Sequence, residues 1–122
     1  MLKDLYPVLP AHDLERARTF YHDKLGMDPE STLDGMLMYS TSGCRFALYE
    51  TPNAGTAQNT QMCLISDDLD SDMATMRAAG VEFEEYDFPG MKTVAGVLSS
   101  DESRTAWFRD SEGNFICVSQ LA

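Results

Sequence analysis

The chain repeats one pattern of strand, turn and helix, and this internal repeat limits the folds open to it. Asp13-Leu14 opens the first predicted helix, and Asp68-Leu69 opens the second one 55 positions later. A second repeated segment lies at the end of each half: residues 43–49 resemble residues 113–119 at an offset of 70 positions. The larger offset predicts a longer insertion in the second half. Duplicated units bury their apolar faces against each other, so we predict a ligand site in a concave space between the halves.

Short apolar runs separated by turn residues predict the secondary structure of each half. Apolar residues at helical spacing follow the N-cap candidates Asp13 and Asp68. Gly26 and Gly80 mark the expected helix ends. Strands are predicted at 6–10, 36–40, 44–50, 61–66, 81–86, 95–99, 105–109 and 114–120, with a loop at 87–94. Each half therefore runs βαβββ, which indicates an α+β fold with two helices and about eight strands.

The length of 122 residues suits one domain, because domains commonly hold about 100–150 residues. Residues 51–59 are rich in Pro, Asn, Gly, Thr and Gln, as is typical of a linker. We therefore expect a single domain with module 1 at about 4–50, a linker at 51–59 and module 2 at about 60–122.

The charge balance excludes some classes of partner. A net charge of −11 argues against nucleic acid and against anionic membrane surfaces, since both require a basic partner. Two interpretations remain open, namely attraction of a cationic ligand and adaptation to solubility or salt. No apolar run reaches the ~18 residues that span a membrane, and the first residues do not resemble a signal peptide. We expect a cytoplasmic protein.

The three cysteines are Cys44, Cys63 and Cys117, and their odd number and spacing suit neither a disulfide framework nor a zinc knuckle. We expect three free thiols that are buried or half-buried, because unpaired cysteine is among the most buried residue types. A nucleophilic thiol would require a base or a positive neighbour that lowers its pKa.

Three motifs in order resemble the vicinal oxygen chelate superfamily, which includes glyoxalase I, extradiol dioxygenases and bleomycin and fosfomycin resistance proteins. Asp-Leu-Glu-Arg-Ala-Arg-x-Phe-Tyr-x-x-x-Leu-Gly (13–26) is similar to its first helix, and 67–81 is similar to its second. Trp-Phe-Arg-Asp-Ser-Glu-Gly-Asn (107–114) resembles its last hairpin, with Ser111 where the family usually has proline. The resemblance covers essentially the whole chain. It implies two βαβββ modules that form an open U-shaped mixed sheet around a cleft.

The resemblance also implies four positions around the cleft where relatives hold one divalent metal with His, Gln or Glu. Carried over to this chain they are Tyr6, Ala47, Gln61 and Cys117, and the repeat offsets of 55 and 70 select the same four. The set holds no imidazole and no carboxylate, whereas catalytic metals of this kind require about three such protein ligands. We expect no metal cofactor.

Alternation along each strand extends the predicted cleft beyond these four positions. The expected lining is aromatic and apolar with a few polar groups, which suits a small organic ligand. The candidate ligand-binding residues are Tyr6, Arg45, Ala47, Tyr49, Gln61, Cys63, Trp107, Phe115, Cys117 and Ser119.

Three functions remain open at this stage. The leading hypothesis is a metal-independent small-molecule-binding protein that sequesters a cationic or aromatic compound, because 6–13 is similar to the opening of bleomycin resistance proteins. The alternative is a glyoxalase-type lyase or isomerase, or a related enzyme, with a nonstandard site, so the sequence leaves open whether the protein is an enzyme. A third possibility is a structural or regulatory module with a filled cleft. The resemblance also implies a homodimer.

Overall fold

The computed structural model describes residues 1–122 as two compact units. Unit 1 consists of residues 1–57 together with the short segment Ser111–Asn114. Unit 2 consists of Gln58–Asp110 and Phe115–Ala122. The turn of the last hairpin therefore belongs to unit 1, while the strands on both sides of that turn belong to unit 2.

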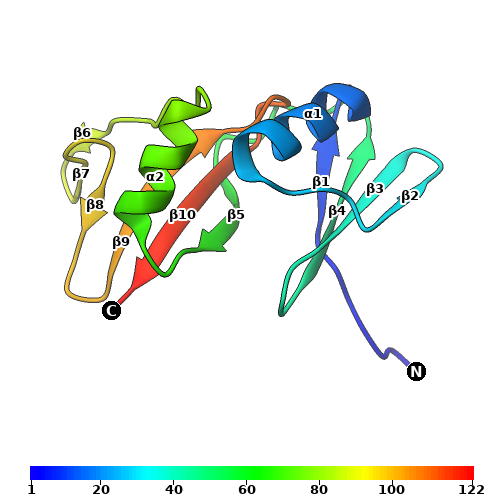
Figure 1. Ribbon diagram of the computed structural model, residues 1–122, viewed down its shortest axis with the longest axis horizontal. Coiled ribbons are helices and arrows are strands. Elements are labelled where there is room, and N and C mark those ends of the chain that lie inside the picture. Colours follow the sequence, from blue (N-terminus) through cyan, green and yellow to red (C-terminus); the bar gives the residue numbers. More distant parts are fainter. The chain divides into compact units, whose positions relative to one another are not determined.

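Unit 1 is a four-stranded mixed sheet with one helix (Figure 1). Its elements are β1 (Val8–Ala11), α1 (Leu14–Leu25), β2 (Ser31–Leu33), β3 (Met36–Ser40) and β4 (Arg45–Glu50). The strand order is β1-β4-β3-β2, in which β1 runs parallel to β4 and the other pairs are antiparallel.

Helix α1 begins and ends at the residues that the sequence predicts. The Asp13 side chain accepts a 3.0 Å hydrogen bond from the Arg16 N–H and so caps one of the free donors of the first turn. Gly26 ends the helix at φ 67°, a left-handed conformation that glycine adopts without a Cβ clash. The buried ring of Tyr21 contacts Tyr39 at 5.4 Å between centroids, which packs α1 on one face of the sheet.

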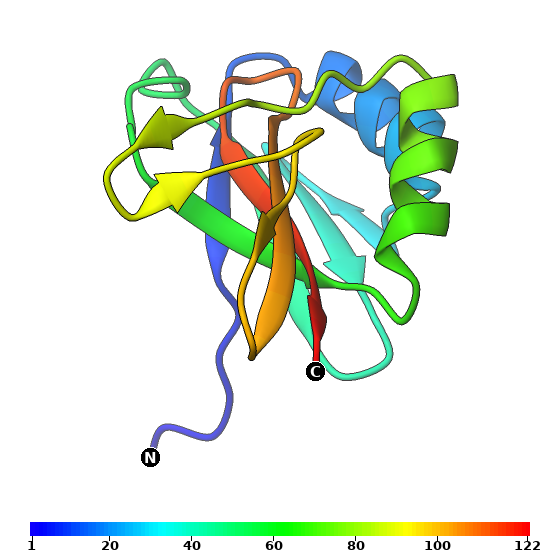
Figure 2. The ribbon, with the colours of Figure 1, turned by 90° about the vertical axis from the view of Figure 1, so that its left-hand side faces the viewer.

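Unit 2 repeats this arrangement and adds a hairpin. Its elements are β5 (Thr60–Ile65), α2 (Leu69–Ala78), β6 (Asp87–Phe88), β7 (Met91–Lys92), β8 (Leu98–Ser99), β9 (Ser103–Arg109) and β10 (Phe115–Leu121). The main sheet has the order β5-β10-β9-β8, and β6 pairs only with β7. Figure 2 follows the chain from α2 to the β6–β7 hairpin and back to β8. The hairpin lies in the longer insertion that the offset of 70 predicts.

The core of unit 2 lies between α2 and its sheet. Leu69 and Met73 of α2 pack against Ala106 of β9 and Val118 of β10, and all four are buried. Asp68 caps α2 by accepting a 3.1 Å hydrogen bond from the Ser71 N–H. Neither α1 nor α2 is long and apolar enough to cross a membrane.

The register of the two sheets confirms the internal repeat. Val8 pairs with Ala47 in unit 1, and Cys63 pairs with Cys117 in unit 2. These pairs are separated by the offsets of 55 and 70 that the sequence shows. The structure therefore confirms the α+β class, with two four-stranded mixed sheets that are not closed.

Some local predictions were wrong. Residues 81–86 form no strand and contribute only an isolated bridge from Phe83 to Phe108. The ladder stops there because the backbone N–H of Tyr86 donates to the Thr93 hydroxyl and its carbonyl accepts from the Thr93 N–H. The predicted loop at 87–94 contains the β6–β7 hairpin. The sequence-based prediction also missed β2, although the turn dipeptide at 34–35 is a common hairpin signal.

Candidate functional site

Each sheet has one face that its own helix covers and one face that this helix leaves uncovered, which we call the open face. In unit 1, Tyr39 and Phe46 contact Tyr21 of α1, so their neighbours in β3 and β4 point to the open face. In unit 2, Ala106 and Val118 contact α2, so their neighbours in β9 and β10 point to the open face. Nine of the ten predicted binding residues have their place on these two faces.

The open face of unit 1 carries Tyr6, Arg45, Ala47 and Tyr49. The Arg45 guanidinium lies 5.9 Å from the centre of the Tyr6 ring and forms a 3.1 Å ion pair with Asp4. Tyr6 and Tyr49 each keep 38% of their surface exposed, whereas Ala47 is fully buried. The structure therefore brings two exposed tyrosines and one ion-paired arginine onto one face.

The open face of unit 2 carries a row of three predicted residues from three neighbouring strands. Cys117 of β10 pairs with Cys63 of β5 on one side and with Trp107 of β9 on the other. Phe115 and Ser119 lie two residues away from Cys117 in β10 and share its face. The Arg109 guanidinium lies 4.7 Å from the centre of the Phe115 ring.

Two of the predicted polar side chains already have partners. The ladder between β5 and β10 is irregular at Gln61, and the Gln61 Oε1 accepts a 3.2 Å hydrogen bond from the Phe115 N–H. The Gln61 side chain therefore supplies the acceptor for a backbone N–H, that of Phe115, which the irregular ladder leaves without a backbone partner. The Ser119 and Thr105 hydroxyls hydrogen-bond each other at 2.7 Å.

An aromatic cluster surrounds Trp107, and the sequence-based prediction found only part of it. Trp107 Nε1 donates a 3.0 Å hydrogen bond to the Thr60 hydroxyl, which orients the indole. The Tyr86 ring meets Trp107 edge-on at 5.9 Å and also contacts Phe88 at 6.0 Å. Phe88 is 55% exposed. The part of this cluster that the prediction missed is visible in the sequence as Tyr86 and Phe88, just before a Pro-Gly dipeptide. This pattern predicts a loop and does not by itself indicate a binding role.

The four positions that hold metal in relatives do not fit a divalent ion in this chain. Ala47 has no donor atom, and Gln61 Oε1 accepts a backbone hydrogen bond. Burial and a hydrogen bond with Cys63 raise the pKa of the Cys117 thiol to about 12, so the thiol stays protonated. Tyr6 offers only a phenol oxygen, which is neither an imidazole nor a carboxylate. No three His, Cys, Asp or Glu side chains lie close enough together to hold a metal ion.

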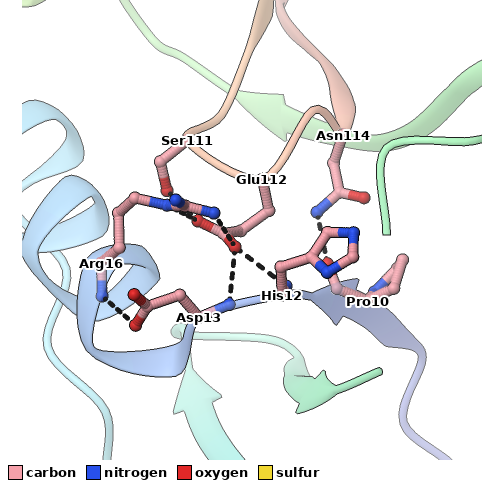
Figure 3. Close-up of polar contacts among 7 residues, drawn as sticks. All are labelled: Pro10, His12, Asp13, Arg16, Ser111, Glu112 and Asn114. Carbon is pink, nitrogen blue, oxygen red and sulfur yellow. Dashed lines mark hydrogen bonds and ion pairs between the residues drawn. The ribbon is translucent and has the colours of Figure 1, made fainter. Parts of the chain in front are cut away.

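The sequence-based prediction also missed a buried carboxylate at the start of α1. Glu112 Oε1 accepts hydrogen bonds of 2.9 Å from the backbone N–H groups of both His12 and Asp13 (Figure 3). The Arg16 guanidinium donates to both carboxylate oxygens, at 2.9 and 3.0 Å, and the Ser111 hydroxyl donates at 2.7 Å. We call these contacts the Glu112 network. They join the turn Ser111–Asn114 to the start of α1 within unit 1.

The Glu112 network holds its carboxylate in the charged form. Burial by itself would raise the pKa of Glu112. Hydrogen bonds from Arg16, the Asp13 N–H and Ser111, and the charge of Arg16, outweigh this effect and lower the pKa to about 2. All of its acceptor capacity serves donors of the chain itself, so the network is structural and not a binding site.

A surface cavity of about 460 Å³ lies beside α2 in unit 2. Three basic side chains line it, those of Arg77, Lys92 and Arg104. Two of them have partners, because Arg104 forms a 2.8 Å ion pair with Asp70 and Arg77 donates to the Ala95 carbonyl at 2.8 Å. None of the predicted binding residues lines this cavity.

The duplicated βαβββ units, their matching sheet order and their aromatic open faces define a protein class built from paired modules. The chain belongs to the Glyoxalase/Bleomycin resistance protein/Dioxygenase superfamily, whose family model matches residues 5–118. The resemblance stated from the three motifs is thereby confirmed. No curated protein matches the sequence.

Solved structures with the same fold include antibiotic-binding proteins. TnmS3, an antibiotic-binding protein from Streptomyces sp. CB03234, is 24% identical with a TM-score of 0.74, and 99% of this chain and 98% of that chain are covered. A bleomycin-binding protein complexed with bleomycin is 20% identical with a TM-score of 0.73 and 98% coverage of both chains. The V. cholerae integron cassette protein VCH_CASS1 is 24% identical with a TM-score of 0.68, covering 100% and 98%. At these identities the likeness shows the fold.

Proposed function

We propose that the protein binds a small cationic or aromatic organic compound through its open faces, without a divalent metal, and thereby sequesters it. The observation that carries this proposal is the set of aromatic side chains on sheet faces that the helices leave uncovered. Tyr6 and Tyr49 are 38% exposed on unit 1. On unit 2, Phe88 is 55% exposed and contacts Tyr86, whose ring in turn meets Trp107. Aromatic rings of this kind stack on planar ligands and attract cations over their faces.

The charge distribution supports a cationic ligand. Both arginines of the open faces are paired, Arg45 with Asp4 at 3.1 Å and Arg109 with Glu84 at 2.8 Å. Neither face therefore presents an unpaired basic group that would repel a cation. The net charge of −11 adds an attractive long-range field. Two structural neighbours, an antibiotic-binding protein and a bleomycin-binding protein complexed with bleomycin, support the same class of ligand.

Metal independence is part of the proposal because of the donor set. The four family positions offer an alanine, a phenol, a protonated thiol and an amide oxygen that is already hydrogen-bonded. Such a set leaves binding to aromatic and polar contacts. Native mass spectrometry after purification without chelators tests this part, and one divalent ion per chain would contradict it.

Isothermal titration calorimetry tests ligand binding directly. The titrants are bleomycin, as a cationic glycopeptide, and aromatic compounds with and without a positive charge. We expect the charged members to bind more tightly, and we expect their advantage to shrink as salt is raised, because screening shortens the range of the field to about 3 Å at 1 M. Absence of binding by every cationic and aromatic titrant would end the proposal.

Matched variants assign the binding to the open faces. Tyr6→Ala removes an exposed ring from unit 1, and Trp107→Leu removes the indole from unit 2. We expect each change to weaken binding about tenfold, as loss of a stacked aromatic contact does. Phe20→Leu is the control, because Phe20 contacts Tyr21 and lies on α1, outside both open faces. Equal affinity in all three variants would remove the open faces from the proposal.

We also propose that the protein is a cytoplasmic homodimer. Family resemblance supports the dimer, and the three free cysteines support a reducing compartment. Sedimentation equilibrium measures the mass of the assembly. A mass equal to 13.6 kDa, that of one chain, would contradict the dimer.

A further inference from the structure

Two cysteines stand side by side on the open face of unit 2, and neither has a role in the function proposed above. Cys63 and Cys117 are direct partners in the parallel ladder of β5 and β10, so their side chains leave the sheet on the same face. The Cys63 thiol donates a 3.7 Å hydrogen bond to the Leu64 carbonyl. Cys117 is 7% exposed, while Cys63 is open to solvent. A reagent from solvent therefore meets Cys63 first and reaches Cys117 next to it.

The spacing of the two strands leaves room for one atom that bonds to both sulfurs. Neighbouring strands lie about 4.8 Å apart, which is within the roughly 4.4–6.8 Å found between the Cα atoms of a disulfide, so the backbone geometry admits a direct bond as well as a bridging atom. A single atom bonded to both sulfurs at about 2.3 Å, the length known for zinc and sulfur, spans up to about 4.6 Å without moving the backbone.

The protonation state of the pair selects the chemistry of the bridging atom. Burial raises the pKa of Cys117 to about 12, and the hydrogen bond with Cys63 acts in the same direction. No basic side chain lowers the pKa of Cys117, and the Cys63 thiol donates to the Leu64 carbonyl. Reagents that need a preformed thiolate are therefore disfavoured. A partner that condenses with two neutral thiols and yields a neutral product avoids burying a charge.

The surroundings of the pair favour an aryl group on that partner. Trp107 is the direct partner of Cys117 on the other side of β10 and lies on the same face. Its indole is held by the bond to Thr60 and by the edge of the Tyr86 ring. Cys63, Cys117 and Trp107 thus form one row across three strands, with two sulfurs followed by an aromatic surface.

We propose that Cys63 and Cys117 form a dithiol site for aryl-substituted compounds of trivalent arsenic, with the aryl group against Trp107. An arylarsonous acid carries two As–OH groups. Two S–H and two As–O bonds break, two As–S bonds form, and two water molecules leave. Arsenic stays trivalent, so the step needs no oxidant or reductant. The product is an uncharged ring closed through both sulfurs, and it forms independently of the sequestering function proposed above.

The test uses the reduced full-length protein and phenylarsine oxide, which hydrates to an arylarsonous acid. We expect one phenylarsenic group per chain by intact mass spectrometry and the loss of two of the three thiols in a thiol titration. Trp107 is the only tryptophan, so its fluorescence reports on the site without a label. A dithiol such as 2,3-dimercaptopropanol should release the arsenical, whereas glutathione at the same thiol concentration should not.

The third cysteine supplies the matched control. Cys44 is exposed and belongs to unit 1, so Cys44→Ser should keep full affinity. Cys63→Ser and Cys117→Ala should each lower the affinity about 100-fold or more, because the second sulfur acts at high effective concentration. Circular dichroism checks the fold of each variant. If Cys117→Ala unfolds, the exposed Cys63→Ser decides alone. Equal affinity in Cys63→Ser and the parent protein, or an unchanged Trp107 fluorescence on binding, would overturn the proposal.

Discussion

The pair Val8–Ala47 and the pair Cys63–Cys117 occupy equivalent places in the two copies of one repeat. Both are direct partners across a parallel ladder, and both point away from the helix of their own unit. The first pair is aliphatic and has no polar side-chain atom, whereas the second pair presents two thiols. The repeat therefore preserves the backbone register and leaves the chemistry of equivalent positions free to diverge.

The closing hairpin turns of the two halves differ in the same way. Glu112 and Gly113 lie 70 positions after Ser42 and Gly43. Glu112 is 4% exposed and carries the Glu112 network, whereas Ser42 lies in an exposed turn. The second turn belongs to unit 1 although its flanking strands belong to unit 2, whereas the first turn lies in the same unit as its flanking strands. Exchanging residues between equivalent positions tests how far this divergence goes.

The largest effect should come from making the second pair resemble the first. The double variant Cys63→Val with Cys117→Ala should lose phenylarsine oxide binding by at least about 100-fold, because both sulfurs are gone. Its fold should survive, since the equivalent pair already places Val and Ala in that register. Calorimetry and thermal unfolding measure the two properties. Retained binding in this variant would locate the arsenical elsewhere.

The next largest effect concerns Glu112. Its folded pKa of about 2 lies below the ordinary value of 4.5, so its contribution to stability is complete above pH 4.5 and is lost as the pH falls toward 2. The loss should amount to about 3 kcal/mol in the free energy of unfolding, measured by urea titration at several pH values. Glu112→Gln should remove this part of the pH dependence. Ser42→Ala, a change at the equivalent position of the first turn, should leave the pH dependence of the free energy of unfolding unchanged.

A smaller effect is expected at Gly113. This residue has φ 88°, and a Cβ there would lie 2.9 Å from the Gly55 Cα. Gly113→Ala should therefore destabilise the protein by about 2 kcal/mol, through backbone strain and a clash with the main chain. A Cβ added at Gly43 would meet no atom within 4 Å, and the φ of Gly43 is not positive. Gly43→Ala should change the free energy of unfolding by less than about 0.5 kcal/mol. Equal losses of stability in Gly113→Ala and Gly43→Ala would contradict the proposed structural difference between the two turns.

The smallest expected effect is a loss of stability at the helix starts, and it should be the same in the two copies of the repeat. Asp13 and Asp68 cap their helices with bonds of 3.0 and 3.1 Å. Replacing either by Ala should cost about 1 kcal/mol, the usual cost of a lost N-cap. Chemical denaturation of Asp13→Ala and Asp68→Ala measures both. A difference of more than about 1 kcal/mol would show that the copies have diverged at the helix starts as well.

The sequence predicted the parts of the molecule that local and repeated patterns determine. The helix starts at Asp13 and Asp68 follow from capping chemistry, and the matching strand order of the two sheets follows from the internal repeat. Alternation along β4 and β10 correctly placed Arg45 beside Tyr6 on one face and Phe115 with Cys117 on another. These features depend on neighbours along the chain or on comparison of the two halves.

The sequence did not predict features that depend on contacts between distant residues. Glu112 is one of 20 acidic residues, and nothing in its local pattern distinguishes a buried carboxylate from a solvated one. Its role arises from Arg16 and the start of α1, almost one hundred positions earlier. The segment 81–86 has an alternating pattern, but the backbone of Tyr86 bonds to Thr93 and the ladder does not form. The arrangement of Tyr86 around Trp107 likewise depends on the β6–β7 insertion.

The assignment of Ser111–Asn114 to unit 1 has a consequence for the order of events during synthesis. The ribosome makes residues 1–57 first, yet the turn that carries Glu112 emerges only after nearly all of unit 2. Until then the backbone N–H groups at the start of α1 lack their acceptor. A chain that stalls before this turn holds an incomplete first unit, so the half of the protein that is translated first is finished only when almost the whole chain has been made.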